Sequence, residues 1–450
     1  MLNRFFWVFV FFTISACAAP PPDNPHTPTP GEESPTPSID EPGLTVEFQI
    51  EPKDHYGQAR QWLDHLDASI KFLEQRVEDQ TSTWLDHADI ARAYLTRARL
   101  TADWQDYRKS QRALERSFEL TSPPAGPLLT RLRFHGAVHL FDRMTEDLQA
   151  LEQRPITGQN PLAMESARAE LDLQRGRTEE AMRRLSELVE KQPSATLASR
   201  LANLEFKTGN HAAASELYER SRTLALTEND LTRAWVELQE GIFDLERGRL
   251  DDALKKFQRA DAIFSGWYLI EEHIAEVYAR QGHFDRAIDL YRDILSRVPA
   301  GEFYDALADT LEDAGRDDEV EAVRKLALAA FENDLNAFPE AAYAHALEHF
   351  LIHGSTHFAL ELAQKNLENR PTPDAHLKWV QALVINGRLE DAHREIVATL
   401  QSTWDSAELH VTATVVFELT DNDALAATHR ARAEALWPDF IDEFDWLAPR

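Results

Sequence analysis

The sequence predicts an all-α protein, a solenoid of helix–turn–helix repeats behind a proline-rich N-terminal tether. Three observations carry this prediction. Glycines recur at a nearly constant spacing, small residues stand at fixed distances from them, and acidic residues follow several of them, as in "GRTEEA" and "GRLEDA". Each glycine is expected to end one helix in the left-handed conformation. The acids would then open the next helix, where they suit its dipole.

The turn glycines are separated by 33, 39, 34, 33, 39 and 33 residues, and the two longer spacings predict longer helices or loops. Small residues five positions after the glycines and seven positions before them would let the paired helices approach closely. The glycines are Gly176, Gly209, Gly248, Gly282, Gly315, Gly354 and Gly387. The later positions hold Ala181, Ala214, Ala253, Ala287, Val320, Ala359 and Ala392, and the earlier ones hold Ala169, Ala202, Gly241, Ala275, Ala308, Leu347 and Val380.

This pattern resembles the tetratricopeptide repeat, a 34-residue helix–turn–helix unit. The stretch 271–299 matches best, through Ala275, Tyr278, Gly282, Ala287, Tyr291 and Pro299. The resemblance covers eight units over 161–438, and in the last unit Asp421-Asn422-Asp423 replaces the turn glycine. It implies a right-handed superhelix whose first helices line a concave groove for an extended peptide or a partner's helix. Residues 439–450 form an acidic-aromatic tail, interpreted as a cap on the last repeat or as an exposed binding motif.

Residues 44–160 are expected to combine a strand-like segment with degenerate helical repeats. Leu44–Ile50 alternates apolar and polar residues, which is typical of a strand, yet no second strand follows it. It would lie extended against the first helices or pair with a partner's sheet edge. Residues 103–124 read as the second half of a repeat unit, preceded by a long helix.

The first 16 residues read as a signal peptide, because a ten-residue apolar run is too short to span a bilayer. Ile14-Ser15-Ala16-Cys17 resembles the bacterial lipobox, which implies that Cys17 becomes the lipidated N-terminus. An ordinary secretory peptide with an incidental cysteine is the alternative. Residues 17–43 hold nine prolines and are expected to form an extended linker with a reach on the order of 80 Å. Ala18 follows the cysteine, which implies an outer-membrane anchor facing the periplasm in a Gram-negative host.

The net charge of −30 argues against nucleic-acid partners and favours protein or peptide partners with basic segments. In residues 301–313, acids recur on one helical face at Glu302, Asp305, Asp309 and Glu312. They are interpreted as a solvated face or as the floor of an acidic groove, with neither aspartate expected to be buried. The groove positions implied by the resemblance are Arg200, Asn203, Phe206, Trp235, Gln239, Ile242, Glu272, His273, Glu276, Glu302, Asp305, Asp309, Glu312, His345 and Glu348.

One short motif indicates a different function. Residues 345–349 read H-x-x-E-H, the inverted zinc-peptidase motif, which sets two imidazoles on one helical face beside a glutamate. A zinc site of this type also needs a third ligand, and none can be identified. The motif falls inside the first helix of an ordinary repeat, so we expect surface or groove histidines, no metal, no cofactor and no small-molecule substrate.

The sequence therefore predicts a membrane-anchored scaffold or adaptor that binds proteins or peptides in the bacterial cell envelope, for the assembly of an envelope complex. It is not expected to be an enzyme. The alternative is a metal-dependent hydrolase that uses His345, Glu348 and His349.

Substitution of Cys17 by serine tests the lipid anchor. Cys17→Ser should move the protein from the membrane fraction to the soluble fraction and abolish labelling with radioactive fatty acid, because a hydroxyl cannot replace the thiol as the acceptor. Fractionation of the variant that matches the wild type would refute lipidation.

Overall fold

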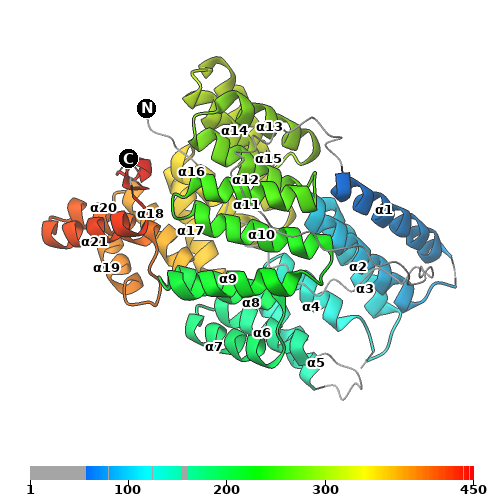
Figure 1. The fold of residues 1–450 in the computed structure, drawn as a ribbon. Helices are drawn as coiled ribbons and strands as arrows, with labels where there is room; N and C mark the ends of the chain where they lie inside the picture. The colour runs from blue at the N-terminus through cyan, green and yellow to red at the C-terminus, as the bar shows by residue number, and fades with distance from the viewer. Residues whose placement is uncertain are drawn as a thin grey trace, which may run out of the picture.

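The computed structural model describes residues 57–79, 81–123, 125–153, 161–438, 440–444 and 446–449. Throughout these residues the chain forms helices joined by short turns, with no strand (Figure 1). The predicted all-α solenoid is therefore confirmed over the described part of the chain. The predicted signal peptide, Cys17, the linker and the strand-like segment 44–50 lie outside these residues.

Eight antiparallel helix hairpins follow one another from residue 161. Successive pairs are α6 (Pro161–Gln174) and α7 (Thr178–Lys191), α8 (Ala195–Lys207) and α9 (His211–Ala225), α10 (Asp230–Leu245) and α11 (Leu250–Ile263), α12 (Tyr268–Arg280) and α13 (Phe284–Arg297), α14 (Gly301–Asp313) and α15 (Asp317–Ala337), α16 (Pro339–Ile352) and α17 (Thr356–Asn369), α18 (Pro373–Ile385) and α19 (Leu389–Thr399), and α20 (Ala407–Leu419) and α21 (Asp423–Leu436). The long spacing after Gly315 is explained by α15, which has 21 residues.

The turns between paired helices have the left-handed residue that the sequence predicts, with one exception. Six of the seven turn glycines have φ between 68° and 79°, and Asp421 takes over this role in the last unit with φ 55°. Gly354 does not have a positive φ, so the prediction of a left-handed residue is wrong at this position. Glycine is required there for a different reason: a Cβ atom would lie 2.3 Å from Cδ1 of Phe350. The residue permits close packing rather than a left-handed turn.

Small residues lie where the paired helices meet. Ala181, Ala214, Ala253, Ala287, Ala359 and Ala392, five positions after the turns, are all completely buried. Their partners seven positions before the turns are buried as well, including Ala202, Ala275 and Ala308. Protein interiors are close-packed, so a larger side chain at these positions has no space to enter.

Five helices precede the eight hairpins. They are α1 (Gly57–Glu78), α2 (Trp84–Thr101), α3 (Trp104–Glu119), α4 (Leu128–Ala137) and α5 (Phe141–Glu152). The pairs α2–α3 and α4–α5 form two further hairpins, as the degenerate pattern of this region predicts. Asp103 caps α3 by accepting a hydrogen bond from the backbone N–H of Gln105 at 2.8 Å.

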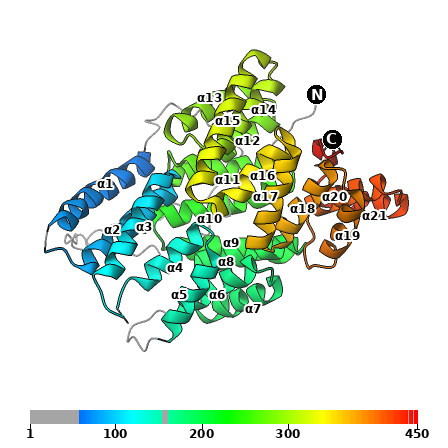
Figure 2. The same cartoon turned by 180° about the vertical axis from the view of Figure 1, so that it is seen from behind.

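The superhelix makes contact with itself, because segments about 200 residues apart touch along a continuous seam (Figures 1 and 2). His139, after α4, bonds through Nδ1 to the carbonyl of Glu340 at 3.3 Å. Arg175, after α6, donates to the carbonyl of Asn369 at 3.4 Å. Further along the seam, the N–H of Asp405 donates to the carbonyl of Lys207 at 2.9 Å. The repeats thus enclose an interior rather than an open groove.

The last residues cover the final hairpin. The 3₁₀ helix η1 (Phe440–Phe444) follows α21, and Phe440, Phe444 and Leu447 are buried in the same core as α20 and α21. The ring of Phe440 stacks on that of Trp437, with centroids 4.2 Å apart. The interpretation as a cap therefore fits these residues, although they form a 3₁₀ turn rather than an α-helix.

Enlarging a buried alanine tests the repeat packing. Ala287→Leu should lower the free energy of unfolding by about 1–3 kcal/mol, because the added carbons have no space between α12 and α13. Thermal denaturation followed by circular dichroism measures this. Ala424→Leu, at an exposed position of α21, should leave the melting temperature nearly unchanged. Equal melting temperatures for the wild type and Ala287→Leu would contradict the packing described here.

Candidate functional site: the central cavity

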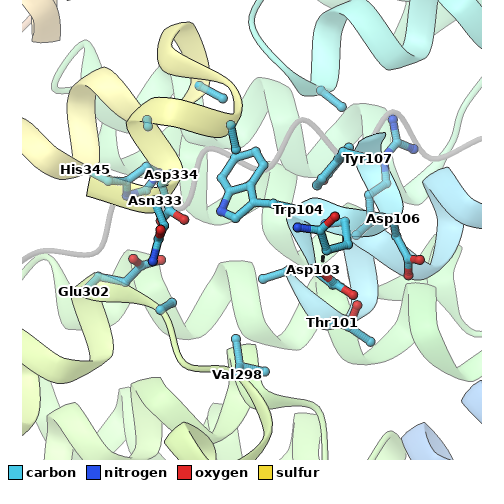
Figure 3. Close-up of a pocket in the computed structure, with 18 of the residues that line it drawn as sticks. Thr101, Asp103, Trp104, Asp106, Tyr107, Val298, Glu302, Asn333, Asp334 and His345 are labelled. Carbon is cyan, nitrogen blue, oxygen red and sulfur yellow. Dashed lines mark hydrogen bonds between the residues drawn. The ribbon is translucent and has the colours of Figure 1, made fainter. Parts of the chain in front are cut away.

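The interior enclosed by the seam contains a cavity of about 900 Å³ (Figure 3). The helices α1–α3 and the end of α4 supply one side, and the region from α13 to α18 supplies the other. The two sides are more than 150 residues apart in the sequence, so the cavity exists only because the superhelix closes. Its size lies within the range of natural binding pockets.

An aromatic cluster forms one wall of the cavity. The ring of Trp104 lies 5.4 Å from that of Tyr107 and 5.7 Å from that of Phe338, between centroids. Phe338 comes directly after α15, whereas Trp104 and Tyr107 belong to α3. In Figure 3 the Trp104 ring stands between Tyr107 and the acidic residues across the cavity. This cluster joins the N-terminal hairpins to the long α15 helix.

Acidic side chains face the aromatic wall. Asp334 on α15 and Glu302 on α14 lie together at one end of the cavity, near His345 (Figure 3). Burial raises the pKa of Asp334 from 3.8 to about 8, and the negative charge of Glu302 adds to the rise, while a hydrogen bond from Trp104 opposes it. Asp334 is therefore largely protonated at neutral pH. A cation that entered the cavity would favour its ionised form.

A second group of charges lies where α16 and α18 meet. Nζ of Lys378 is 3.3 Å from Oε1 of Glu348 and 3.0 Å from Oε1 of Glu408. Burial raises the pKa of Glu348 to about 7, and Lys378 only partly offsets the cost of burial. Nearby His139 has its pKa lowered to about 3 by burial, with Arg370 and His345 acting in the same direction. It stays neutral at physiological pH.

Three of the predicted groove residues line this cavity: Glu302, His345 and Glu348. Glu312 is exposed and lies outside it. Phe206 and Trp235 are buried in two separate hydrophobic clusters, and Ile242 packs against the cluster of Trp235. The half-buried Gln239 and Asn203 also lie outside the cavity lining.

The prediction that Asp305 and Asp309 are exposed is wrong, since they are only 1% and 2% exposed. Arg324 on α15 binds both carboxylates, with Nη1 3.1 Å from Oδ1 of Asp305. His349 on α16 also bonds to Asp305, with Nδ1 2.9 Å from Oδ2. The acidic face of α14 is therefore bonded to α15 through Arg324 and to α16 through His349. Burial raises the pKa of Asp309 to about 8, although Arg324 acts against the rise.

The other charged positions of the predicted groove are also engaged in ion pairs. Arg200 pairs with Glu170, and its Nη1 donates to Oγ of Ser166 at 2.9 Å. Buried Glu276 pairs with Arg280, with Oε1 3.1 Å from Nε. Buried Glu272 and His273 pair with each other: these two charges stabilise each other within α12 and are not available to solvent. Breaking such a pair is costly, because it leaves a charge buried without a partner.

The H-x-x-E-H motif is divided between two environments. His349 is 4% exposed and bonded to Asp305, so the prediction of a surface or groove histidine is wrong there. His345 and Glu348 instead line the cavity. Tyr343, Ala346, Leu347 and Phe350 pack in or against the core, as the repeat register predicts. Among the described residues no group of three or more histidine, cysteine or acidic side chains is placed to hold a metal ion.

Several cavity residues could not be found from the repeat pattern. Trp104 and Tyr107 lie in the degenerate N-terminal region, and Asp334 and Arg370 lie near the ends of second helices, which the family pattern places away from the groove. Sequence spacing identifies positions within a repeat. It carries no signal for which repeats meet after one full superhelical turn.

The fold and the cavity define the class of the protein: an α-solenoid of helix hairpins that closes around a charged interior. A family model described as tetratricopeptide repeat matches residues 273–300, which belong to the α12–α13 hairpin. Residues 273–300 therefore match a tetratricopeptide repeat, as the resemblance implied, and the other helix pairs have the same helix–turn–helix arrangement.

Three of the solved structures that match this chain do so at low sequence identity and low TM-score. The human IFIT1 dimer with m7Gppp-AAAA is 14% identical with a TM-score of 0.41, covering 86% of this chain and 96% of its own. MamA is 22% identical with a TM-score of 0.31, covering 37% and 96%. A tetratricopeptide repeat protein from Parabacteroides merdae is 15% identical with a TM-score of 0.36, covering 58% and 97%. Similarity at this level does not transfer a ligand. No curated protein matches the chain.

Neutralising Asp334 tests the electrostatics of the cavity. Because the folded pKa is about 8 and the ordinary value is 3.8, the folded state holds a proton between these values that the unfolded chain releases. The contribution of this group to stability therefore falls as pH rises from about 4 to about 8. Asp334→Asn should be more stable than the wild type by on the order of a few kcal/mol at pH 8, and nearly equal to it at pH 4.

The measurement is the melting temperature of both proteins across this pH range. Glu332→Gln, at an exposed position of the same helix, is the matched control and should follow the wild type throughout. A constant difference between Asp334→Asn and the wild type would show that Asp334 titrates normally.

Proposed function

We propose that the protein is a scaffold or adaptor of the bacterial cell envelope, anchored through a lipid on Cys17, and that it binds a peptide segment of a partner protein in its central cavity. The observation that carries this proposal is the cavity itself. It is large, it is lined by charged and aromatic side chains, and it is the place where both turns of the superhelix contribute residues.

The chemistry of the lining suits a peptide. Trp104 and Tyr107 offer apolar and aromatic surface, while Glu302 and the protonated Asp334 offer a site for a basic side chain. A bound cation would favour the ionised form of Asp334 and would lower the pKa of this carboxyl. The proposed preference for basic partners therefore rests on the cavity lining and not on the acidic face of α14, whose two aspartates are buried and paired with Arg324.

The anchor and the envelope location rest on the N-terminal sequence. Among the described residues, no helix has both the length and the apolar character required to cross a membrane. The proposed membrane attachment rests on Cys17 and the sequence before it, and the nine-proline linker would hold the folded body at a distance from the bilayer. Assembly of an envelope complex is the role that such an anchored adaptor would serve.

Filling the cavity tests the proposed binding site. Ala344 on α16 lines the cavity and is partly exposed to it, so Ala344→Phe should occupy the space that a peptide needs. Affinity purification from an envelope extract, at low and at moderate salt, should recover partners with the wild type and lose them with this variant. Recovery by the wild type should decrease at higher salt, because ionic contacts are screened.

Ala329→Phe is the matched control, since Ala329 is exposed on α15 and lies outside the cavity lining. It should recover the same partners as the wild type. Circular dichroism verifies that both variants are folded. If Ala344→Phe is folded and recovers every partner of the wild type, the cavity is not the binding site.

A further inference from the structure

Helix α1 belongs to no hairpin, whereas every other α-helix of the described residues is half of one. Figures 1 and 2 show α1 at the edge of the molecule, beside α2. Two of its 22 residues, Ala59 and Ile70, are buried, against seven of 18 in α2. Elements with few buried apolar contacts open locally at low free energy, and lids over binding sites are drawn from such elements. This property singles out α1 among the walls of the cavity.

The two halves of α1 are attached to different parts of the fold. In the second half, Ile70 is buried in a cluster with α2 and α3, and Leu73 and Val77 pack against that cluster. In the first half, Ala59 belongs to the core of the central repeats. Its N–H donates to the carbonyl of Ser265, in the turn between α11 and α12, at 3.1 Å. The helix therefore spans the space between the N-terminal hairpins and the central repeats.

The first half of α1 also forms part of the cavity lining, through Arg60, Leu63 and Asp67. Their spacing of three and four residues places them on one face of the helix. None of these three side chains is buried. Because α1 lies at the edge of the molecule, this half of the helix is an outer wall of the cavity (Figures 1 and 2).

The polar contacts of this half can be broken without leaving a buried group unpaired. Oγ of Ser265 donates to Oε1 of Gln58 at 2.8 Å, and neither side chain is buried. Asp67 is half exposed, and its Oδ1 lies 2.5 Å from Nη1 of Arg97. Arg97 also donates to Asp106 through Nε at 2.6 Å and through Nη2 at 2.7 Å, so it keeps a carboxylate when Asp67 leaves. Breaking a contact is costly chiefly where one partner stays buried alone.

The seam between successive turns is attached more firmly. Lys207 is 3% exposed, and its carbonyl accepts a hydrogen bond from the N–H of Asp405 at 2.9 Å. Gly176 packs so closely on Pro371 that a Cβ atom would lie 2.3 Å from the carbonyl oxygen of Pro371. Opening the seam would break backbone bonds and close packing between whole hairpins. Opening at α1 requires only the release of three exposed helical turns.

We propose that the first three turns of α1, residues 57–67, form a lid on the central cavity. They detach from Ser265 and unwind to admit a ligand, while residues 70–78 stay packed on α2. This inference rests on the proposed function in taking the cavity as a binding site, and it adds the route by which the site is reached.

Labelling of a thiol inside the cavity measures access without a ligand. The full chain carries Cys17→Ser, which removes its one native thiol, and Ala344→Cys, which places a thiol on the cavity lining. Gly57→Cys with Ser265→Cys locks the lid, because a Cβ atom on Gly57 would lie 3.3 Å from Cβ of Ser265, close to the spacing of about 3.5–4.5 Å found in disulfides. Fluorescein maleimide is the probe, and peptide mass spectrometry follows its attachment at residue 344 and confirms the locking disulfide.

Oxidation of the lock should slow labelling at residue 344 by at least about 10-fold, and reduction should restore it, since access requires local opening of α1. Ala329→Cys, at an exposed position of α15 outside the lining, is the control and should be labelled at the same rate with the lock oxidised or reduced. Equal labelling at residue 344 in the two states of the lock, or no labelling in either state, would overturn the lid.

A release variant gives a second measurement that needs no disulfide. Gln58→Ala with Asp67→Ala should accelerate labelling at residue 344 by about 3- to 10-fold, because two contacts that hold the lid are removed. It should also speed amide hydrogen exchange in residues 61–67 while leaving residues 70–78 unchanged. Gln61→Ala with Gln75→Ala, at exposed positions of α1 outside the lining, should behave as the unmodified chain. If the lock does not form, an unchanged labelling rate in the release variant overturns the lid.

Recovery of partners from the envelope extract separates this inference from the proposed function. Labelling that depends on the lock, together with partners that still bind the oxidised lock, supports the lid and contradicts peptide binding in the cavity. Labelling that ignores the lock, together with partners lost in Ala344→Phe, refutes the lid and leaves the proposed function standing.

Discussion

Contact between successive turns of the superhelix is the constraint on which the rest of the structure depends. Backbone and side-chain bonds from His139, Arg175 and Lys207 to residues about 200 positions later join the turns along a seam. These contacts place the N-terminal hairpins against α15–α17 and convert an open concave face into an interior. The burial of charged side chains, the shifted pKa values of Asp334 and Glu348, and the cavity all follow from this closure.

Packing between neighbouring repeats also changes what the charged residues do. Acids that share a solvent-exposed helical face are screened by solvent and contribute little to stability. Asp305 and Asp309 are instead buried against α15 and α16, where Arg324 binds both of them and His349 binds Asp305. The two aspartates thereby specify how α14, α15 and α16 are arranged. Among the described residues, the paired buried charges hold the repeats together, whereas the side chain of Arg370 makes no ion pair and lines the cavity.

The hairpins could be predicted from the sequence because their determinants are local. A left-handed turn residue and two small residues per unit lie within about 12 positions of one another, and the structure confirms nearly all of them. The cavity could not be predicted in the same way. Trp104 meets Phe338 across more than 200 residues, and no periodic signal encodes such a pair. Glu302, His345 and Glu348 were identified because they occupy first-helix positions, whereas Asp334 lies on a second helix and Arg370 directly follows one.

The seam sets a limit on how this molecule can evolve. Open solenoids gain and lose repeats readily, since each unit contacts only its neighbours and a duplication extends the array without disturbing the rest. In this chain, an added or deleted unit between α6 and α17 would move every later segment out of step with its counterpart on the preceding turn. The close contacts at two glycines would then be lost. A Cβ atom on Gly176 would lie 2.3 Å from the carbonyl oxygen of Pro371, and Gly248 packs against the side chain of Trp437. The number of repeats in this segment is therefore fixed by geometry.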